Sequence, residues 1–176
     1  TESEDPDAPL YYYYTIDCIN SDLEGAPDER DPSERRQIRT MDDVKTVRGG
    51  DLILSLNTMT ASFVSKEHDG YLLTLNFARI VPKKQLSPAF LLFLFNEDGR
   101  IRRQMMGDSI VDLKKTSVKQ LSNIEFKCLP DMYTQESIGK TYLNQKHISY
   151  LRRHVLELED EYVLGCLKRS IKNHHK

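Results

Sequence analysis

The segment Thr134-Gln-Glu-Ser-Ile138 begins a run of helix-forming residues that continues to Asn173 without a proline. Gly139 and Gly165 are the only glycines in this run. A helix of this length would extend about 60 Å, which is longer than a small globular domain needs. We therefore predict one long C-terminal helix that must pack its apolar side chains against a partner.

Apolar residues recur along the second half of this run at intervals of three and four. This spacing keeps them on one face of a helix and is typical of a coiled coil. The predicted dimerisation residues, called the seam below, are Ile148, Leu151, Val155, Leu158 and Tyr162.

The rest of the 176-residue chain is long enough for one domain of ordinary size. We expect this domain over residues 1–132, with residues 1–10 disordered, and the long helix over residues 133–176. Cys18, Cys128 and Cys166 are far apart and form no CxxC pair. They favour free thiols in a reducing compartment and argue against a disulfide scaffold or a zinc site.

Two further features indicate a cytoplasmic protein with no membrane partner. No apolar run approaches the length that spans a bilayer, and the N-terminus is acidic, unlike a basic-then-apolar leader. Residues 1–29 contain nine acidic residues and no lysine or arginine, so subtracting −9 from the total charge of −2 leaves +7 for residues 30–176. A basic body is compatible with a polyanionic partner, but charge alone favours a mixed solvated surface beside an acidic, partly disordered terminus.

Coarse patterns predict an α+β fold: a compact domain of mixed sheet and helix, followed by one long coiled-coil-forming helix. Strand composition or alternation predicts strands over 11–18, 52–56, 61–65, 71–75, 77–81 and 123–129. Residues 20–43 are predicted to form a loop with a helical turn near 33–38. Helices are predicted over 89–96, with Ser87 as N-cap and Pro88 at the first position, and over 100–106 and 116–121. Strands that precede helices favour α+β over regular α/β alternation.

The usual catalytic signatures are missing from the sequence. There is no glycine-rich phosphate loop, GxSxG or HExxH motif. His147 and His154 are seven residues apart and fit the flank of a coiled coil better than a metal site. We therefore expect no catalytic residues, no metal ligands, no cofactor and no active site of the chain's own.

Cations and amides are concentrated in three segments that are predicted to be loops or short helices. Arginine and lysine neutralise phosphates, while arginine, glutamine and asparagine can bond base edges. Any one of these side chains could equally be an ordinary exposed residue. The predicted DNA-binding residues are Arg35, Arg36 and Arg39; Asn57, Thr58 and Thr60; and Arg100, Arg103, Gln104, Ser109, Lys114 and Lys115.

Six segments occur in an order that matches a known family. They are Val47-Arg-Gly-Gly-Asp-Leu-Ile-Leu-Ser55, Leu75-Asn-Phe-Ala-Arg-Ile-Val-Pro82, Ser87-Pro-Ala-Phe-Leu-Leu-Phe-Leu94, Gly107-Asp-Ser-Ile-Val-Asp-Leu113, Asn123-Ile-Glu-Phe-Lys-Cys-Leu-Pro130 and Gln135-Glu-Ser-Ile138. In this order they resemble a target recognition domain and spacer helix from the specificity subunit of type I restriction–modification enzymes. The resemblance runs from about Tyr11 to the C-terminus.

The resemblance implies a subunit that reads one half of a split site on double-stranded DNA. It also implies that the long helix pairs with that of a second specificity half and docks methyltransferase (modification) subunits, which carry the active sites. The family's usual subunit has two recognition domains and two spacer helices, whereas this chain has one of each. Thr134 and the pair Asp131-Met132 also depart from the family's acidic residue and second proline.

These departures lead us to expect a half-subunit that pairs with a copy of itself or a sister chain. A homodimer would read a palindromic, interrupted site. The alternatives are a coiled-coil protein-interaction module and a degenerate relative that keeps the fold without binding DNA.

Overall fold

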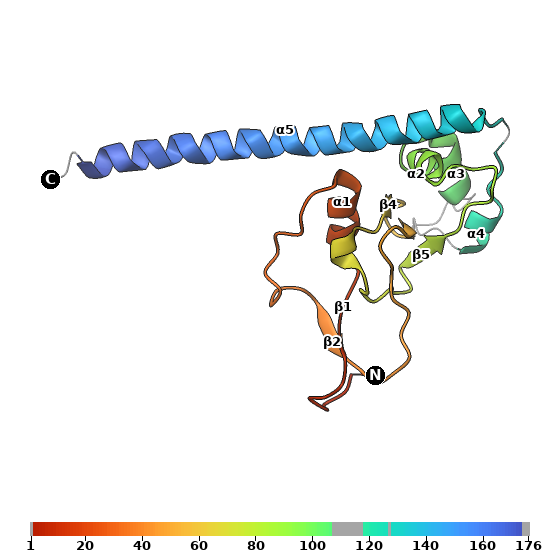
Figure 1. The fold of residues 1–176 in the computed structure, drawn as a ribbon, viewed down its shortest axis with the longest axis horizontal. Coiled ribbons are helices and arrows are strands. Elements are labelled where there is room, and N and C mark those ends of the chain that lie inside the picture. The colour runs from red at the N-terminus through yellow and green to blue at the C-terminus, as the bar shows by residue number, and fades with distance from the viewer. Residues whose placement is uncertain (1, 107–117, 127, 174–176) are drawn as a thin grey trace.

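The computed structural model describes residues 2–106, 118–126 and 128–173, and its long helix runs far beyond a head of small sheets and short helices (Figure 1). The α+β prediction is confirmed, with small sheets and one long C-terminal helix. The elements, in chain order, are β1 (Leu10–Tyr12), α1 (Ile16–Glu24), β2 (Gln37–Arg39), β3 (Leu52–Ser55), β4 (Ala61–Phe63), the 3-10 helix η1 (Lys66–His68), β5 (Phe77–Ile80), α2 (Pro88–Glu97), α3 (Gly99–Met106), α4 (Val118–Ser122) and α5 (Met132–Asn173).

The centre of the head is an antiparallel sheet with the strand order β4-β3-β5. All four residues of β3 are buried, as the apolar sequence of this strand predicts. Because side chains alternate across a strand, Leu52 and Leu54 join a core formed with α2, α3 and Tyr142 of α5, while Ile53 joins a second core around Tyr14. The sheet is therefore covered on both faces.

Helix α1 corrects the sequence prediction, which placed a strand over 11–18 and a loop over 20–43. Only Leu10–Tyr12 is a strand here, and it pairs with β2. The side chain of Thr15 caps the helix by accepting a hydrogen bond from the Cys18 amide. Gly25 ends it in the left-handed conformation, at φ 62°. These are ordinary helix-start and helix-stop signals.

Three other predicted elements differ in the structure. Residues 33–38 contain a turn followed by β2 in place of a helical turn. Residues 71–75 form no strand. Within this segment Leu72 alone is paired, through isolated bridges to Tyr13 and Thr46. Among the described residues of the predicted strand 123–129, none is in a sheet; the backbone of Glu125 bonds the side chain of Gln104 instead.

The predicted helices after β5 are confirmed over their described residues, while residues 116 and 117 of the predicted helix 116–121 lie outside these. The start of α5 is tied to the start of α2. Pro88 occupies the first turn of α2, as predicted, but the Ser87 side chain makes no capping bond. Instead, the buried Gln135 accepts a hydrogen bond from the Ser87 amide at 2.9 Å, and its amide nitrogen donates to the carbonyls of Gln85 and Pro130. Gln135 thus clips three segments together where the long helix begins.

The first half of α5 packs on the head, chiefly on α2 and α1 (Figure 1). Tyr142 donates to Glu97 at 2.7 Å, and Lys146 pairs with the same carboxylate at 3.1 Å. Further along, Arg153 pairs with Glu24 at the C-terminal end of α1, at 2.6 Å. These contacts fix the direction in which α5 leaves the head.

The N-terminal residues also contact the head. The Ser3 amide donates to the Arg39 carbonyl at 2.8 Å, and Ala8 is buried. The disorder expected for residues 1–10 stays a prediction.

The junction between Glu97 and α5 should weaken in acid. Burial alone would raise the pKa of Glu97, but hydrogen bonds from Tyr142 and Lys146 outweigh it and hold the pKa below its ordinary value. A depressed pKa contributes stability that is present above the unfolded-state pKa and is lost as pH falls through the folded-state pKa. Glu97→Gln should therefore reduce the free energy of unfolding at pH 7, and the difference from the native chain should shrink below pH 4.5.

Urea unfolding at pH 7 and pH 4 measures this difference. Glu136→Gln is the matched control, because Glu136 forms only an exposed pair with Lys140 at 3.7 Å. If Glu97→Gln lowers the free energy of unfolding by the same amount at both pH values, the proposed stabilising role of the Glu97 carboxylate is contradicted.

Candidate nucleic-acid interface and pairing helix

The turn between β3 and β4 presents two polar side chains at one end of the central sheet. The Ser55 amide donates to the Thr60 carbonyl and the Met59 amide donates to the Ser55 carbonyl, which closes the turn. Met59 is buried beneath it with a φ of 54°, and the predicted site residues Asn57 and Thr58 are exposed. Thr60 is half-buried. Asn57 and Thr58 are therefore exposed on a hydrogen-bonded turn.

Asn96 connects this turn to α3. Its side-chain oxygen accepts from the Ala61 amide at 2.8 Å, and its side-chain nitrogen donates to the Ala61 carbonyl at 2.9 Å. Arg102 of α3 in turn donates to the Asn96 carbonyl at 2.9 Å. These bonds link β4, which follows the 57–60 turn, through α2 to α3, but they involve none of the predicted site residues themselves.

The exposed face of α3 carries Arg100 and Arg103. Arg100 forms a two-point contact with Asp98, whose pKa it lowers to about 2. Arg103 donates to the Gly99 carbonyl at 3.1 Å, and no described carboxylate lies within ion-pair distance of its guanidinium. Within the described residues, the Arg103 charge is therefore not paired with a carboxylate.

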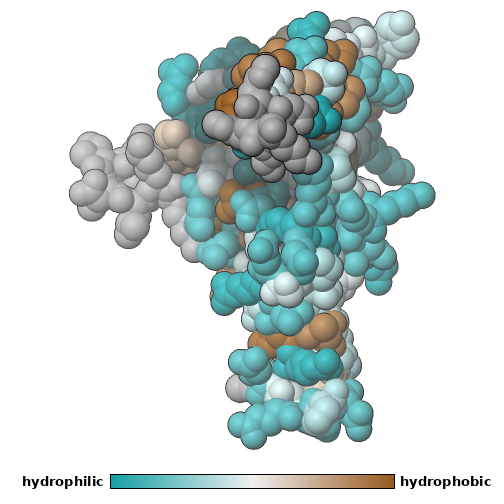
Figure 2. Space-filling model, turned by 90° about the vertical axis from the view of Figure 1, so that its left-hand side faces the viewer, coloured by the Kyte–Doolittle hydropathy of each residue, from teal (hydrophilic) through white to brown (hydrophobic). Residues whose placement is uncertain are grey.

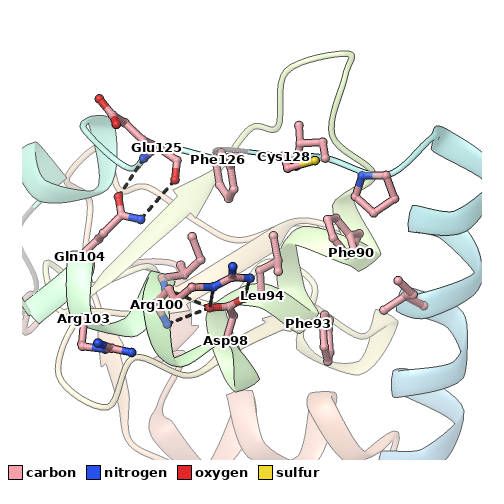
Figure 3. A pocket seen from close by; sticks show the side chains of 14 residues that line it. Phe90, Phe93, Leu94, Asp98, Arg100, Arg103, Gln104, Glu125, Phe126 and Cys128 are labelled. Carbon is pink, nitrogen blue, oxygen red and sulfur yellow. Dashed lines mark hydrogen bonds and ion pairs between the residues drawn. The ribbon is translucent and has the colours of Figure 1, made fainter.

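Beside this face lies a cavity of about 580 Å³ between α2, α3 and the segment that precedes α5 (Figure 3). Gln104 closes one side, because its amide both donates to the Glu125 carbonyl and accepts from the Glu125 amide, at 3.2 and 2.9 Å. Both ends of this side-chain amide are used inside the chain. The walls are mainly apolar and include Phe90, Phe93, Leu94, Ile101, Phe126 and Leu129.

The remaining predicted cluster lies elsewhere. Figure 1 places β2 at the end of the head farthest from α5, whereas α3 lies beside the start of α5. Arg35 donates hydrogen bonds to the Tyr71 hydroxyl and to the carbonyls of Asp28 and Arg30. Arg39 donates to two carbonyls of the N-terminal segment, and Arg36 stacks over the Tyr13 ring at 4.5 Å. Ser109, Lys114 and Lys115 lie outside the described residues.

The second half of α5 extends beyond the head and is exposed. Every residue from Val155 to Leu164 is exposed. The seam residues Ile148, Leu151, Val155, Leu158 and Tyr162 have exposed fractions between 44% and 69%. Figure 2 looks at the molecule with this end toward the viewer, and hydrophobic side chains gather around it above a mostly hydrophilic head. An exposed apolar row of this length calls for a partner.

The seam faces away from the head. At about 100° per residue, Val155 is turned by about 160° from Gly139, and Leu158 by the same angle from Tyr142. Gly139 and Tyr142 are both buried against the head. The sequence analysis missed a second exposed row, which lies within about 40° of the Tyr142 direction and therefore on the head side. This head-side row consists of Leu156, Leu164, Leu167 and Ile171.

Within the part of the chain that the structure describes, no helix is both long enough and apolar enough to cross a membrane.

The sequence does not predict the role of Asn96, because a single polar residue in the last turn of an apolar helix carries no local sign of its distant partner.

No model of a protein family matches the chain, and no curated protein sequence matches it. Among solved structures, the chain is similar to the crystal structure of the HsdS subunit from Thermoanaerobacter tengcongensis, with a TM-score of 0.56 and 19% sequence identity. The match covers 89% of this chain and 41% of that chain. The chain therefore shares the fold of an HsdS subunit, a type I restriction specificity subunit, over less than half of that subunit's length.

Proposed function

We propose that the chain is a DNA sequence-recognition subunit of a type I restriction–modification system, without an active site of its own. The observation that carries the proposal is the combination of an HsdS-like fold with an exposed apolar rod outside the head. The match spans 41% of the HsdS subunit, and the described residues form one head and one long helix. Each head would read one half of a split DNA target.

The seam would pair with a second copy in antiparallel orientation. Four acidic residues lie between Glu157 and Glu161, and Arg152 and Arg153 precede them. A parallel copy in register would set each block beside its own like charges. In an antiparallel pair centred on Val155, Arg152 lies beside the partner's Glu159. The seam of one helix then packs against the seam of the other. Charge therefore favours the antiparallel pair, which carries the two heads at opposite ends.

The head-side row would remain uncovered in such a pair, because it points away from the seam. Leu156, Leu164, Leu167 and Ile171 are each more than half exposed. We assign this row to the methyltransferase subunit of the same system. The two partners would then use different faces of one helix.

DNA would contact the head at the turn 57–60 and at α3. Asn57 and Thr58 would reach base edges, while Arg103 and Arg100 would bind phosphates; Arg100 is paired with Asp98, but its side chain is 83% exposed. Arg36 is a candidate for a separate phosphate contact, whereas the donors of Arg35, Arg39 and Gln104 are engaged within the chain.

Removing the two arginines of α3 should weaken DNA binding and change its salt dependence. If each makes one phosphate contact, the slope of log affinity against log salt for the Arg100→Ala/Arg103→Ala variant should fall by about 2. Fluorescence anisotropy with a labelled duplex over a salt series measures the slope, with and without the methyltransferase subunit.

Lys83→Ala/Lys84→Ala is the matched control, because it removes two exposed cations before the other end of α2. Its slope should match that of the native chain. Equal losses in both double variants would indicate non-specific attraction and contradict the proposed surface.

A protein-interaction module that assembles through α5 is the second candidate, and the two exposed apolar rows favour it. It predicts normal pairing with no duplex preference. In that case both double variants should behave like the native chain.

A further inference from the structure

A buried cluster of ionisable side chains lies between α1, η1 and the loop that follows α1. Cys18, Asp28 and His68 are all buried, and one ligand atom from each lies within 4.8 Å of the others. Thiolate, imidazole and carboxylate form a donor set that suits Zn²⁺. The interface described above uses none of these side chains.

The histidine in this cluster is oriented as in many metal sites. His68 Nδ1 lies 2.7 Å from Asp22 Oδ1, and the second oxygen of Asp22 accepts from the Tyr14 hydroxyl at 2.7 Å. The other ring nitrogen, Nε2, faces Asp28 Oδ2 at 3.3 Å. A carboxylate that fixes one ring nitrogen and turns the other toward the ion is the usual support for a metal-binding histidine.

The spacing of the donors also fits. Two ligands of a tetrahedral ion with metal–ligand bonds of about 2.0 Å lie about 3.3 Å apart. His68 Nε2 and Asp28 Oδ2 lie at this separation, at which they also form a hydrogen bond with each other. Cys18 is fully buried, and one ligand atom from each of the three residues lies within 4.8 Å of the others.

Arg30 approaches the same atoms from the surface. Its Nη2 lies 3.2 Å from Cys18 Sγ and 2.9 Å from Asp28 Oδ2, while Nη1 reaches the exposed Asp17 at 3.1 Å. The Arg30 side chain is 30% exposed. Arg30 Nε also lies 2.7 Å from Asp28 Oδ1, and Arg35 Nε lies 3.5 Å from Asp28 Oδ2. Arg30 thus pairs with two of the three ligands and would have to move outward for a metal ion to bind.

We propose that Cys18, Asp28 and His68 bind one zinc-type divalent cation, with Asp22 orienting His68 and Arg30 competing for the ligands. The three ligands come from separate segments of the head, so binding would fasten α1, η1 and the loop between α1 and β2 together. The site is independent of the DNA-reading role.

Cobalt titration of the purified, chelator-treated full chain tests the site, because Co²⁺ reports both thiolate ligation and tetrahedral geometry. The native chain should bind one Co²⁺ with a thiolate-to-cobalt charge-transfer band, and Zn²⁺ should displace it. Cys18→Ser should abolish the band, whereas Cys128→Ser and Cys166→Ser should keep it. Asp22→Asn should weaken binding about 10–100-fold, as loss of such a support does elsewhere.

Arg30→Ala separates a metal site from a purely structural ion-pair cluster. Removal of the competing cation should tighten Co²⁺ binding, and Zn²⁺ should raise the thermal unfolding midpoint of the native chain. Circular dichroism checks that each variant is folded. The proposal is overturned if the native chain shows no charge-transfer band, or if the band survives in Cys18→Ser or disappears in the Cys128→Ser and Cys166→Ser controls.

Discussion

Gly139→Ala should loosen the long helix from the head, although alanine is the better helix former. A Cβ atom at Gly139 would lie 2.5 Å from the Ala89 carbonyl carbon and Cβ, and 2.7 Å from the Phe90 amide nitrogen. Two of these three atoms belong to the backbone of α2, so the two helices would have to move apart. Overpacking of this kind costs about 1–3 kcal/mol, which exceeds the gain of about 1 kcal/mol in helix propensity.

Gly165→Ala is the matched control on the same helix, because nothing lies within 4 Å of its added Cβ. It should stabilise α5 by up to about 1 kcal/mol. Urea unfolding followed by circular dichroism gives both values. The two substitutions should therefore have opposite signs, and equal stabilisation at both sites would show that α5 does not pack on α2 through Gly139.

Leu158→Asp should abolish pairing of the rods. In a symmetric pair each substitution occurs twice, so two buried leucine side chains, worth about 1.5–3 kcal/mol each, are lost and two carboxylates are desolvated. Because each tenfold change in the dissociation constant corresponds to about 1.4 kcal/mol, the dissociation constant should rise by at least about two orders of magnitude. Sedimentation velocity over a concentration series measures it.

Leu156→Asp is the control, because it makes the same change two residues away. Leu156 and Leu158 have similar exposed fractions, 61% and 50%, but they lie on different sides of the helix. Leu156→Asp should leave the pair intact and weaken only the attachment of the methyltransferase subunit. If both variants remain paired, or both dissociate, the seam is not the pairing face.

Local patterns were enough to predict α5 and α2. The proline-free run predicts the first, and Pro88 followed by apolar residues predicts the second; both signals act within one element. Helix α1 was missed because the run of four tyrosines favours a strand, although Thr15 and Gly25 mark the ends of a helix. In this segment the tyrosine composition and the capping residues favour different structures, and the capping residues agree with the fold.

The predicted strand over 123–129 failed for a tertiary reason. Ile124 and Phe126 pack against the core formed with α2 and α3, and the backbone of Glu125 is bound by the Gln104 side chain. The backbone N–H and C=O of Glu125 therefore need no neighbouring strand as a hydrogen-bond partner. Apolar alternation alone does not distinguish this arrangement from a strand.

The candidate sites depend on contacts between residues far apart in the sequence. Asn96 joins Ala61 of β4 to Arg102 of α3, and Arg35 is engaged by Tyr71, 36 residues away. The proposed metal ligands come from three segments and have no CxxC-like spacing. Residue types could be predicted from the sequence, whereas the partners of each side chain could not.

The central claim is that the chain reads a DNA sequence as a pair of heads held apart by α5. Selection of bound duplexes from a random library, with the chain alone and with its methyltransferase subunit, tests this claim most directly. We predict enrichment of a short motif repeated in inverted orientation at one fixed spacing. Recovery of duplexes with no common motif under both conditions would contradict it.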